Sequence, residues 1–362
     1  MTATGEKPVR VALIGCGRHA SGCIHPSLPY LPELEVVGVC DLDESLARET
    51  ARNLDTSAIY TNMDSMLSEE QPDATIVVGP GGMHAEVGLA CLKAGFHLFV
   101  DKPPALNPRD ARRLAAAAAQ HNLIGQVGHN QRHSPAIRTA RHITDSAEFG
   151  EPTTVITKYG GWIPEEPRWG LSPLLGGLLY FHSIHAVDTA RFFMGDIRSV
   201  SAYQVSGIEV SGGGPIAVIL EFVSGGLGFV DLNTSTPYYQ MRTIVAGSAG
   251  TSVEVVDLNR VEYLMPPEAA GKRGVVPAEP ELAGFHNVIP SFNWTVPRYY
   301  PMEKAFGYVD ELASFARAVH TGEPSSPTLS DGYENLLALE AIARSIETGA
   351  PVIIDEMREE LG

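Results

Sequence analysis

The chain lacks the features typical of secreted, membrane and nucleic-acid-binding proteins. Its 362 residues include only four cysteines and no Cys-x-x-Cys pair, which fits neither a disulfide framework nor a zinc site. The first ten residues are polar, and no apolar run reaches the ~20 residues of a membrane-spanning helix. Lys and Arg number 26 against 43 Asp and Glu, a formal net charge of -17 without any basic run. We therefore expect a cytoplasmic protein with reduced thiols that binds neither nucleic acid nor membranes.

What the chain has is a change of pattern near residue 130. Before it, continuous apolar runs alternate with helical patterns, which predicts a doubly wound parallel sheet of the Rossmann type. The predicted strands are 9–14, 35–40, 74–78, 96–100 and 123–127, and the predicted helices are 42–54, 84–94 and 107–121. We assign residues 1–130 to a dinucleotide-binding domain.

The remainder, residues 131–362, has longer strands with period-two alternation and Gly-rich breaks, which predicts an α+β domain with a large, mainly antiparallel sheet. Its predicted strands are 153–159, 199–205, 216–222, 227–232 and 240–246, and its predicted helices are 182–194, 303–320 and 331–348. We expect this part to bind substrate and to mediate oligomerisation, with late helices that pack back on the first domain. Residues 265–302 lack a clear period and are long enough for a functional loop.

A Gly-x-Gly-x-x-Ala fingerprint, Gly15 to Ala20, follows the first predicted strand and opens a helix. Gly15 permits a tight turn, and Gly17 lets the backbone approach a pyrophosphate at the helix N-terminus. The second strand ends at Asp41, whose carboxylate can accept hydrogen bonds from an adenosine ribose; a helix N-cap is its other interpretation. Acidic residues here repel a 2'-phosphate, so the sequence favours NAD over NADP, although Arg18 remains a basic alternative.

Asp101-Lys102-Pro103 stands where the fourth apolar run ends. The carboxyl ends of strands in an open parallel sheet face the ligand crevice, so Lys102 is a candidate acid or base. The alternative is a solvated lysine in a turn that prolines make rigid.

Together these motifs resemble the glucose-fructose oxidoreductase, inositol dehydrogenase and rhizopine-catabolism (Gfo/Idh/MocA) family of NAD(P)-dependent oxidoreductases. The resemblance also includes Gly79 to His84, Gly128 to Arg132, and Gly176-Gly177 leading to His185. It implies that Lys102 and His185 are catalytic. In the family an aspartate precedes the histidine by four residues, but Phe181 stands there, so Tyr180 or His182 is expected to compensate; Asp188 is either a further partner or a structural anchor.

The fingerprint and the resemblance imply two sets of binding residues. The expected cofactor ligands are Gly15, Gly17, Arg18, His19, Asp41, Pro80, His84, Asp101, Lys102 and Asn130. Polar and aromatic groups suited to a sugar give the expected substrate ligands Lys102, Arg132, Lys158, Trp162, Arg168, Trp169, His182 and His185. A metal shared by His182 and His185 is the less favoured interpretation, because no further ligand cluster is evident.

The resulting hypothesis is an NAD-dependent enzyme that transfers a hydride between nicotinamide and a secondary alcohol or ketone of a sugar, cyclitol or sugar derivative. The alternatives are a redox-assisted hydrolase or epimerase that retains its NAD, and a non-catalytic protein that senses NAD or sugar. A sheet with one uncovered face predicts a homodimer or homotetramer.

Overall fold

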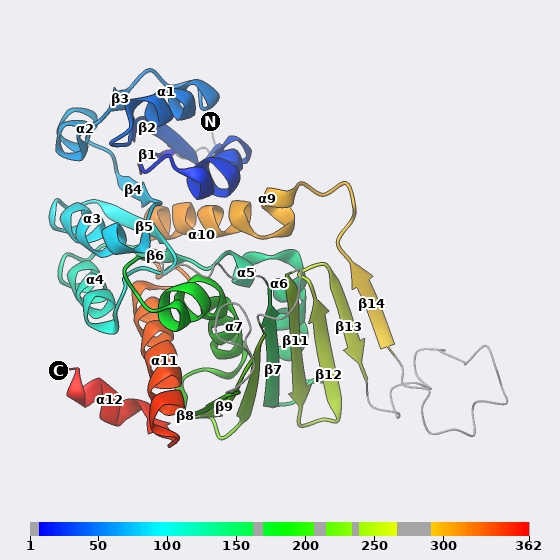
Figure 1. Cartoon of the computed structure of the whole chain (residues 1–362). Helices are drawn as coiled ribbons and strands as arrows, with labels where there is room; N and C mark the ends of the chain where they lie inside the picture. The colour runs from blue at the N-terminus through cyan, green and yellow to red at the C-terminus, as the bar shows by residue number, and fades with distance from the viewer. Residues whose placement is uncertain (1–6, 162–168, 206–214, 234–238, 266–290, 362) are drawn as a thin grey trace.

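The computed structural model describes residues 7–161, 169–205, 215–233, 239–265 and 291–361. Two sheets organise this part of the chain; helix α10 (Tyr308–Thr321) lies between them, and α11 (Leu329–Thr348) runs alongside the second sheet (Figure 1). Both the Rossmann sheet and the mainly antiparallel sheet of the prediction are confirmed. The boundary at residue 130 remains a proposal.

The first sheet has six parallel strands in the order β3-β2-β1-β4-β5-β6. Its strands are β1 (Val9–Ile14), β2 (Leu34–Cys40), β3 (Ile59–Tyr60), β4 (Ala74–Val77), β5 (His97–Asp101) and β6 (Gly125–Gly128). The helical elements of this part are a π-helical segment (Ala20–Ile24), a 3-10 helix (His25–Tyr30), α1 (Glu44–Asn53), α2 (Met63–Glu70), α3 (Gly81–Lys93), α4 (Pro108–Gln120), α5 (Asn130–His133) and α6 (Pro135–Thr144). β3 and α2 are not predicted from the sequence, because a two-residue strand and a short polar helix carry too little periodicity.

Polar side chains fix where the helices of this half begin. Asn107 caps α4 by accepting a hydrogen bond from the Asp110 amide, and Ser134 caps α6. The cap of α1 is Asp43, whose carboxylate accepts from the Ser45 amide. The N-cap interpretation of Asp41 is therefore wrong, and its carboxylate faces the strand ends instead.

The second sheet has nine strands in the order β14-β13-β12-β11-β7-β10-β9-β8-β15. Neighbouring strands are antiparallel except for β7 and β10, which run parallel. The strands are β7 (Pro152–Gly160), β8 (Ile197–Gln204), β9 (Ile216–Phe222), β10 (Leu227–Asn233), β11 (Gln240–Gly247), β12 (Thr251–Val256), β13 (Arg260–Leu264), β14 (Ser291–Thr295) and β15 (Val352–Ile353). One face of the sheet packs against α7 (Ile184–Met194) and α11.

The observed elements correct several boundaries in this half. The predicted helix 182–194 begins at Ile184 and follows a π-helical segment (Pro173–Ser183), so His182 does not share the α-helical register of His185. The expected loop 265–302 contains β14, while its residues 266–290 lie outside the described part. The remaining helices are α9 (Met302–Ala305) and α12 (Ile354–Glu360).

The predicted helix 303–320 is broken at Gly307 into α9 and α10. Gly307 has φ +90°, and a Cβ there would lie 2.2 Å from the Asn130 carbonyl oxygen. Only glycine permits both this backbone angle and this close approach. The break turns α10 onto the first sheet, where Val309, Leu312 and Phe315 join its core.

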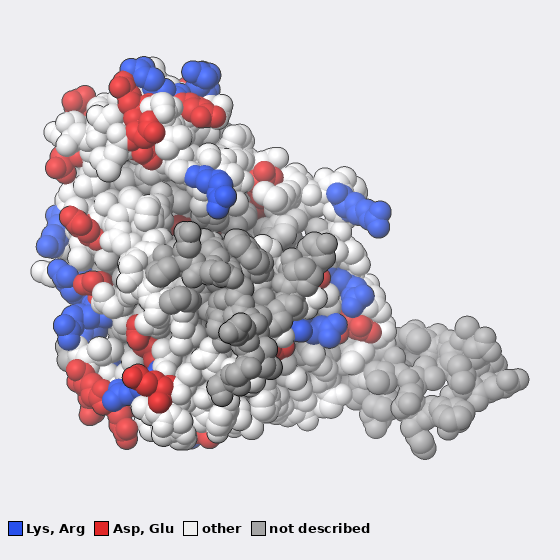
Figure 2. Space-filling view, viewed as in Figure 1, with Lys and Arg blue, Asp and Glu red and all other residues white. Residues whose placement is uncertain are grey.

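Charged residues are dispersed over the surface. Figure 2 shows Lys and Arg interspersed with Asp and Glu on the visible face, without a continuous basic area among the residues coloured there. No helix in the described ranges has the length and apolar character needed to cross a bilayer.

Candidate active site

The fingerprint lies at the mouth of a hollow of about 540 Å³ at the carboxyl edge of the first sheet. Its lining includes Gly15, Gly17, Asp41, Leu42, Pro80 and Met83. Gly15 has φ +97°, and a Cβ there would lie 1.9 Å from the Val78 carbonyl oxygen; a Cβ at Gly17 would meet nothing within 4 Å. The turn therefore requires glycine at the first position and leaves the backbone open at the second, as a pyrophosphate requires.

Asp41 is held at the rim of this hollow. Its carboxylate accepts hydrogen bonds from the backbone amides of Cys16 (2.7 Å) and Asp43 (2.9 Å). These bonds tie the end of β2 to the fingerprint turn and fix the direction of the negative charge. The hollow and its acidic rim fit the adenosine half of a dinucleotide.

His19 and Asp101 form a charged pair beside the fingerprint, with Nε2 3.5 Å from Oδ2. Asp101 raises the pKa of His19 to about 10, against the opposing effect of burial. Burial opposes ionisation of Asp101, but His19 and Lys102 outweigh it and lower the pKa of the carboxyl. An imidazolium therefore lies next to the glycine turn, where it can face an anionic cofactor. Arg18 is exposed on the same turn.

His84 has a different role from the one expected. It is fully buried; its Nδ1–H donates to the Pro103 carbonyl (2.7 Å), and its Nε2 accepts from the Gly79 amide (2.9 Å). Both ring nitrogens are thus engaged by backbone, and burial lowers the pKa of the ring. The expectation of a direct cofactor contact is corrected: His84 clamps the turn after β4 to the turn that carries Lys102. Pro80 lies at the start of α3 and lines the hollow.

Lys102 follows directly after β5, at the edge expected from the sequence. Its Nζ donates to the Phe181 carbonyl (3.1 Å) and lies 4.7 Å from the centroid of the Phe181 ring. The Trp169 ring lies 6.0 Å from the same phenylalanine ring. The residue that replaces the family aspartate therefore contacts the lysine directly, through its backbone oxygen and its aromatic face.

Aromatic rings continue from Phe181 along the wall of the site. The His182 ring lies 4.5 Å from that of Phe181 and 5.4 Å from that of Tyr239. Tyr159 stacks on His185 at 6.1 Å, with an interplanar angle of 17°. Burial lowers the pKa of His185 well below its usual value, with a further lowering by Lys102, so its imidazole is neutral. Lys102, His182 and His185 are thus brought together as expected.

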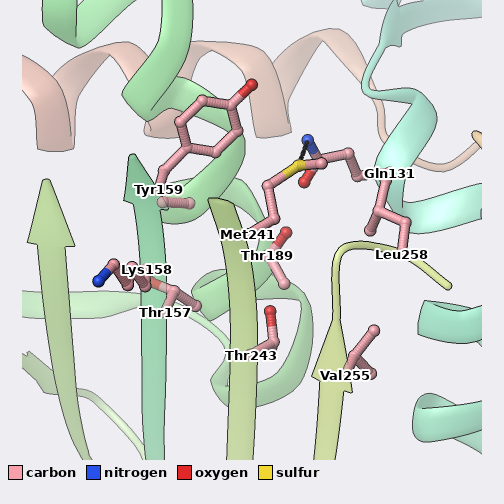
Figure 3. Close-up of a pocket in the computed structure, with 10 residues that line it drawn as sticks. Gln131, Thr157, Lys158, Tyr159, Thr189, Met241, Thr243, Val255 and Leu258 are labelled. Carbon is pink, nitrogen blue, oxygen red and sulfur yellow. Dashed lines mark hydrogen bonds between the residues drawn. The ribbon is translucent and has the colours of Figure 1, made fainter. Parts of the chain in front are cut away.

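Tyr159 and Tyr239 were not among the sequence candidates. The signal for Tyr159 was present, because alternation along β7 places residues 155, 157 and 159 on one face of the sheet. The same alternation corrects Lys158, which points to the opposite, open face and lies 3.5 Å from Asp231. In Figure 3 the side chains of Lys158 and Tyr159 leave β7 in different directions. Lys158 is therefore removed from the substrate residues.

Arg132 was expected at the substrate and instead forms a buried ion pair. Its Nε and Nη2 donate to the two carboxylate oxygens of Asp188, each at 2.7 Å. Asn335 also donates to Asp188 (2.7 Å), and Arg132 and Asp188 are 6% and 1% exposed. The Arg132 guanidinium is thus bound by Asp188 inside the protein. Asp188 is therefore the structural anchor that was one of its two interpretations from the sequence.

Two further candidates are also engaged inside the protein. The Tyr180 hydroxyl donates to Glu340 of α11, and burial and this carboxylate raise its pKa. The Asn130 amide donates to the Phe306 carbonyl (2.8 Å). Trp162 and Arg168 lie outside the described residues. Within the described ranges, no group of three or more His, Cys, Asp or Glu side chains is arranged to hold a metal ion.

A six-stranded Rossmann sheet with this glycine turn, a strand-end lysine and a facing histidine define the class of NAD-binding oxidoreductases. Residues 9–129 match the model of the oxidoreductase family with an NAD-binding Rossmann fold, and residues 137–253 match the GFO/IDH/MocA C-terminal domain. The chain belongs to the GFO/IDH/MocA family, which confirms the resemblance.

Full-length relatives agree with this assignment. The chain is 26% identical to the myo-inositol 2-dehydrogenase of Thermotoga maritima over 358 residues, which cover 96% of this chain and 99% of the relative. It is 27% identical over 375 residues to the scyllo-inositol 2-dehydrogenase (NAD(+)) of Bacillus subtilis, covering 99% of each. A solved structure of levoglucosan dehydrogenase in complex with NADH and L-sorbose superposes with a TM-score of 0.79 at 20% identity, covering 96% of this chain and 99% of that one.

Proposed function

We propose that this protein is an NAD-dependent dehydrogenase or reductase that acts on a secondary alcohol or ketone of a sugar, cyclitol or sugar derivative. The observation that carries the proposal is the position of Lys102. It stands where the carboxyl edge of the dinucleotide-binding sheet meets the aromatic wall of Phe181, His182 and Tyr159. Aromatic faces stack on the C–H surfaces of cyclic polyols, and the reacting hydroxyl would lie beside the amine.

The reaction separates a hydride from a proton. A bound NAD⁺ would supply the hydride acceptor for the carbinol carbon, whose C–O single bond would become a carbonyl. Lys102 Nζ takes the hydroxyl proton, and in the reverse direction it returns that proton to the alkoxide oxygen. His185, which burial keeps neutral, hydrogen-bonds the same oxygen. Phe181 exchanges no proton, so Lys102 and His185 alone carry out the proton transfer for which the resemblance implies a lysine, an aspartate and a histidine.

The cofactor in this proposal is NAD and not NADP. Two backbone amides fix the carboxylate of Asp41 at the rim of the hollow. In this position it would accept hydrogen bonds from the ribose hydroxyls and repel a 2'-phosphate. The names of the relatives, two inositol dehydrogenases and a levoglucosan dehydrogenase, support a cyclic polyol as substrate and a place in carbohydrate metabolism.

We also propose a cytoplasmic homodimer or homotetramer formed through the open face of the second sheet. Ile244, Ile156, Phe229 and Ile219 occupy paired positions on four adjacent strands of this face. The last three are 37–41% exposed in the single chain, so a second copy that covers the row would bury a continuous apolar strip.

The test is a screen of sugars and cyclitols at several pH values, followed by NADH absorbance, with Lys102→Met as the variant. The variant keeps an unbranched side chain and removes only the terminal amine, so we expect it to retain NAD binding and to lose turnover. Lys93→Met on the surface of α3 is the matched control and should keep full activity. A Lys102→Met protein that turns over like the wild type contradicts the mechanism.

The same screen separates the alternatives. NAD that copurifies and is regenerated in every cycle would support a redox-assisted hydrolase or epimerase. Binding of NAD and a sugar without any turnover would support a sensor.

A further inference from the structure

His129 lies behind His185 and has no part in the proposed chemistry. It follows directly after β6, is fully buried, and its ring meets that of His185 edge to face, with centroids 5.9 Å apart and planes at 87°. His185 itself is 7% exposed. A buried imidazole in contact with the candidate catalytic imidazole can determine which of its nitrogens carries the proton.

The protein fixes the tautomer of His129 through Asn335. Arg191 donates to Asn335 Oδ1 (2.9 Å), so the amide nitrogen must point the other way. That nitrogen donates to Asp188 Oδ1 (2.7 Å) and lies 3.1 Å from His129 Nε2. An amide nitrogen only donates, so His129 Nε2 is the acceptor. Burial lowers the pKa of His129 to about 4, and the single proton of the neutral ring is therefore on Nδ1.

That proton has no acceptor in the described part of the chain. His129 Nδ1 is enclosed without a hydrogen-bond partner, and Asp188 Oδ2, at 3.8 Å, is too distant for a direct bond. Nδ1 of His185 is enclosed without a partner in the same way. The two touching rings thus hold one unpaired donor and one unpaired nitrogen, and each such group is costly to leave unsatisfied. A single hydrogen bond between them satisfies both.

We propose that His129 is the positioning residue of His185. Its Nδ1–H is directed at His185 Nδ1 already in the free enzyme and biases the His185 tautomer there, and the bond tightens when substrate fills the site, as catalytic hydrogen bonds that are loose in the free enzyme do in the complex. This bond holds the proton of His185 on Nε2, where it is offered to the substrate oxygen. Asp188 thus orients the His185 ring indirectly, through Asn335 and His129. This replaces, from the protein interior, the orientation that a carboxylate at position 181 would give and that Phe181 cannot. The inference rests on the proposed function for its kinetic effect only.

The first test does not need turnover. In protein labelled with [15N]histidine, the ring nitrogens of His185 are assigned by comparison with His185→Gln, and their shifts report the tautomer. We expect the Nε2–H form in the wild type. His129→Phe, which keeps a ring but has no donor, should produce a mixture of tautomers. Unchanged His185 shifts in His129→Phe would overturn the proposal.

The second test compares two amide variants of the same position. The amide nitrogen of Asn occupies the place of a histidine Nδ1, and that of Gln the place of Nε2. We expect His129→Asn to keep kcat within about 3-fold, and His129→Gln and His129→Phe to lower it about 10- to 100-fold with an unchanged KM for NAD. Equal losses in all three variants, with parallel losses of melting temperature, would show a merely structural residue. Failure of the Lys102→Met test would refute the proposed function and leave the tautomer result standing.

Discussion

The buried ion pair between Arg132 and Asp188 gives the sharpest quantitative prediction. Asp188→Asn keeps the shape of the side chain and removes its charge, which leaves the Arg132 guanidinium buried without its bidentate partner. Breaking a buried pair on one side costs about 3–5 kcal/mol, because the remaining charge stays desolvated. Asp331, 3.6 Å from Arg132 and 28% exposed, partly compensates. We therefore expect the lower end, about 3 kcal/mol, or a fall in melting temperature of roughly 4 °C for a chain of 362 residues.

The pH dependence of this loss has a definite sign. Arg132 and His129 hold the pKa of Asp188 well below its usual range, although burial opposes ionisation. A carboxyl whose pKa is depressed in the folded state stabilises the fold above its unfolded pKa, about 3.9, and loses that contribution as the pH falls through the folded pKa. The difference between wild type and Asp188→Asn should thus be complete at pH 7 and shrink in acid below about pH 4.

The assay is urea unfolding of both proteins at pH 7 and in acid. The matched control is Asp310→Asn, which breaks an exposed pair with Arg138 (3.5 Å; side chains 34% and 59% exposed) and should cost less than about 1 kcal/mol. If Asp188→Asn costs no more than this control, the carboxylate is not a structural anchor and the reasoning is refuted.

Three further predictions concern the cofactor, a buried acid and the open sheet. Asp41→Asn should raise the ratio of NADPH to NADH affinity about 10-fold. The substitution removes the negative charge of the carboxylate, and hydrogen bonds between a charged group and the ribose hydroxyls of NADH contribute about 1.5–3 kcal/mol. An unchanged affinity ratio in fluorescence titrations would contradict this prediction. Burial raises the pKa of Glu311 well above its usual value, and its carboxyl oxygens have no partner among the described residues. The stabilising contribution of the neutral acid is complete below the unfolded pKa and falls by about 1.4 kcal/mol per pH unit as the pH rises towards the folded pKa. Glu311→Gln does not titrate, so its free energy of unfolding should increase relative to that of the wild type as the pH rises from about 5 to 7. A difference in urea unfolding that stays constant with pH would argue against a neutral acid. Phe229→Glu should dissociate the oligomer in sedimentation experiments while the exposed Tyr299→Glu does not, and identical behaviour would exclude this face as the interface.

The sequence predicted those parts of the site that depend on short-range geometry. The glycine turn after β1, the acidic residue after β2 and the lysine after β5 each belong to one strand end, and the edge of a parallel sheet brings strand ends together. Parallel topology therefore converts three local patterns into one site. Tyr159 was not predicted, although the alternation along β7 already places it on the face of the sheet opposite Lys158.

Pairings between distant segments could not be predicted in this way. In the sequence, Arg132 looks like a substrate ligand and Asn130 like a cofactor ligand, because both are polar and stand at a domain junction. Their partners, Asp188 and the Phe306 carbonyl, come from segments 56 and 176 residues away. No periodicity relates such segments, and only their packing shows that the polar groups are already satisfied.

The phenylalanine at position 181 changes how the site must be supported. A carboxylate beside the candidate catalytic histidine, His185, would fix its tautomer from the substrate side. Here that side is aromatic and contacts Lys102, whereas the charges are behind the histidine, in the pair formed by Asp188 and Arg132. A buried pair is rigid because moving either partner leaves a desolvated charge. His129 lies between this pair and His185, so in the proposal it connects the rigid pair to the histidine of the reaction centre.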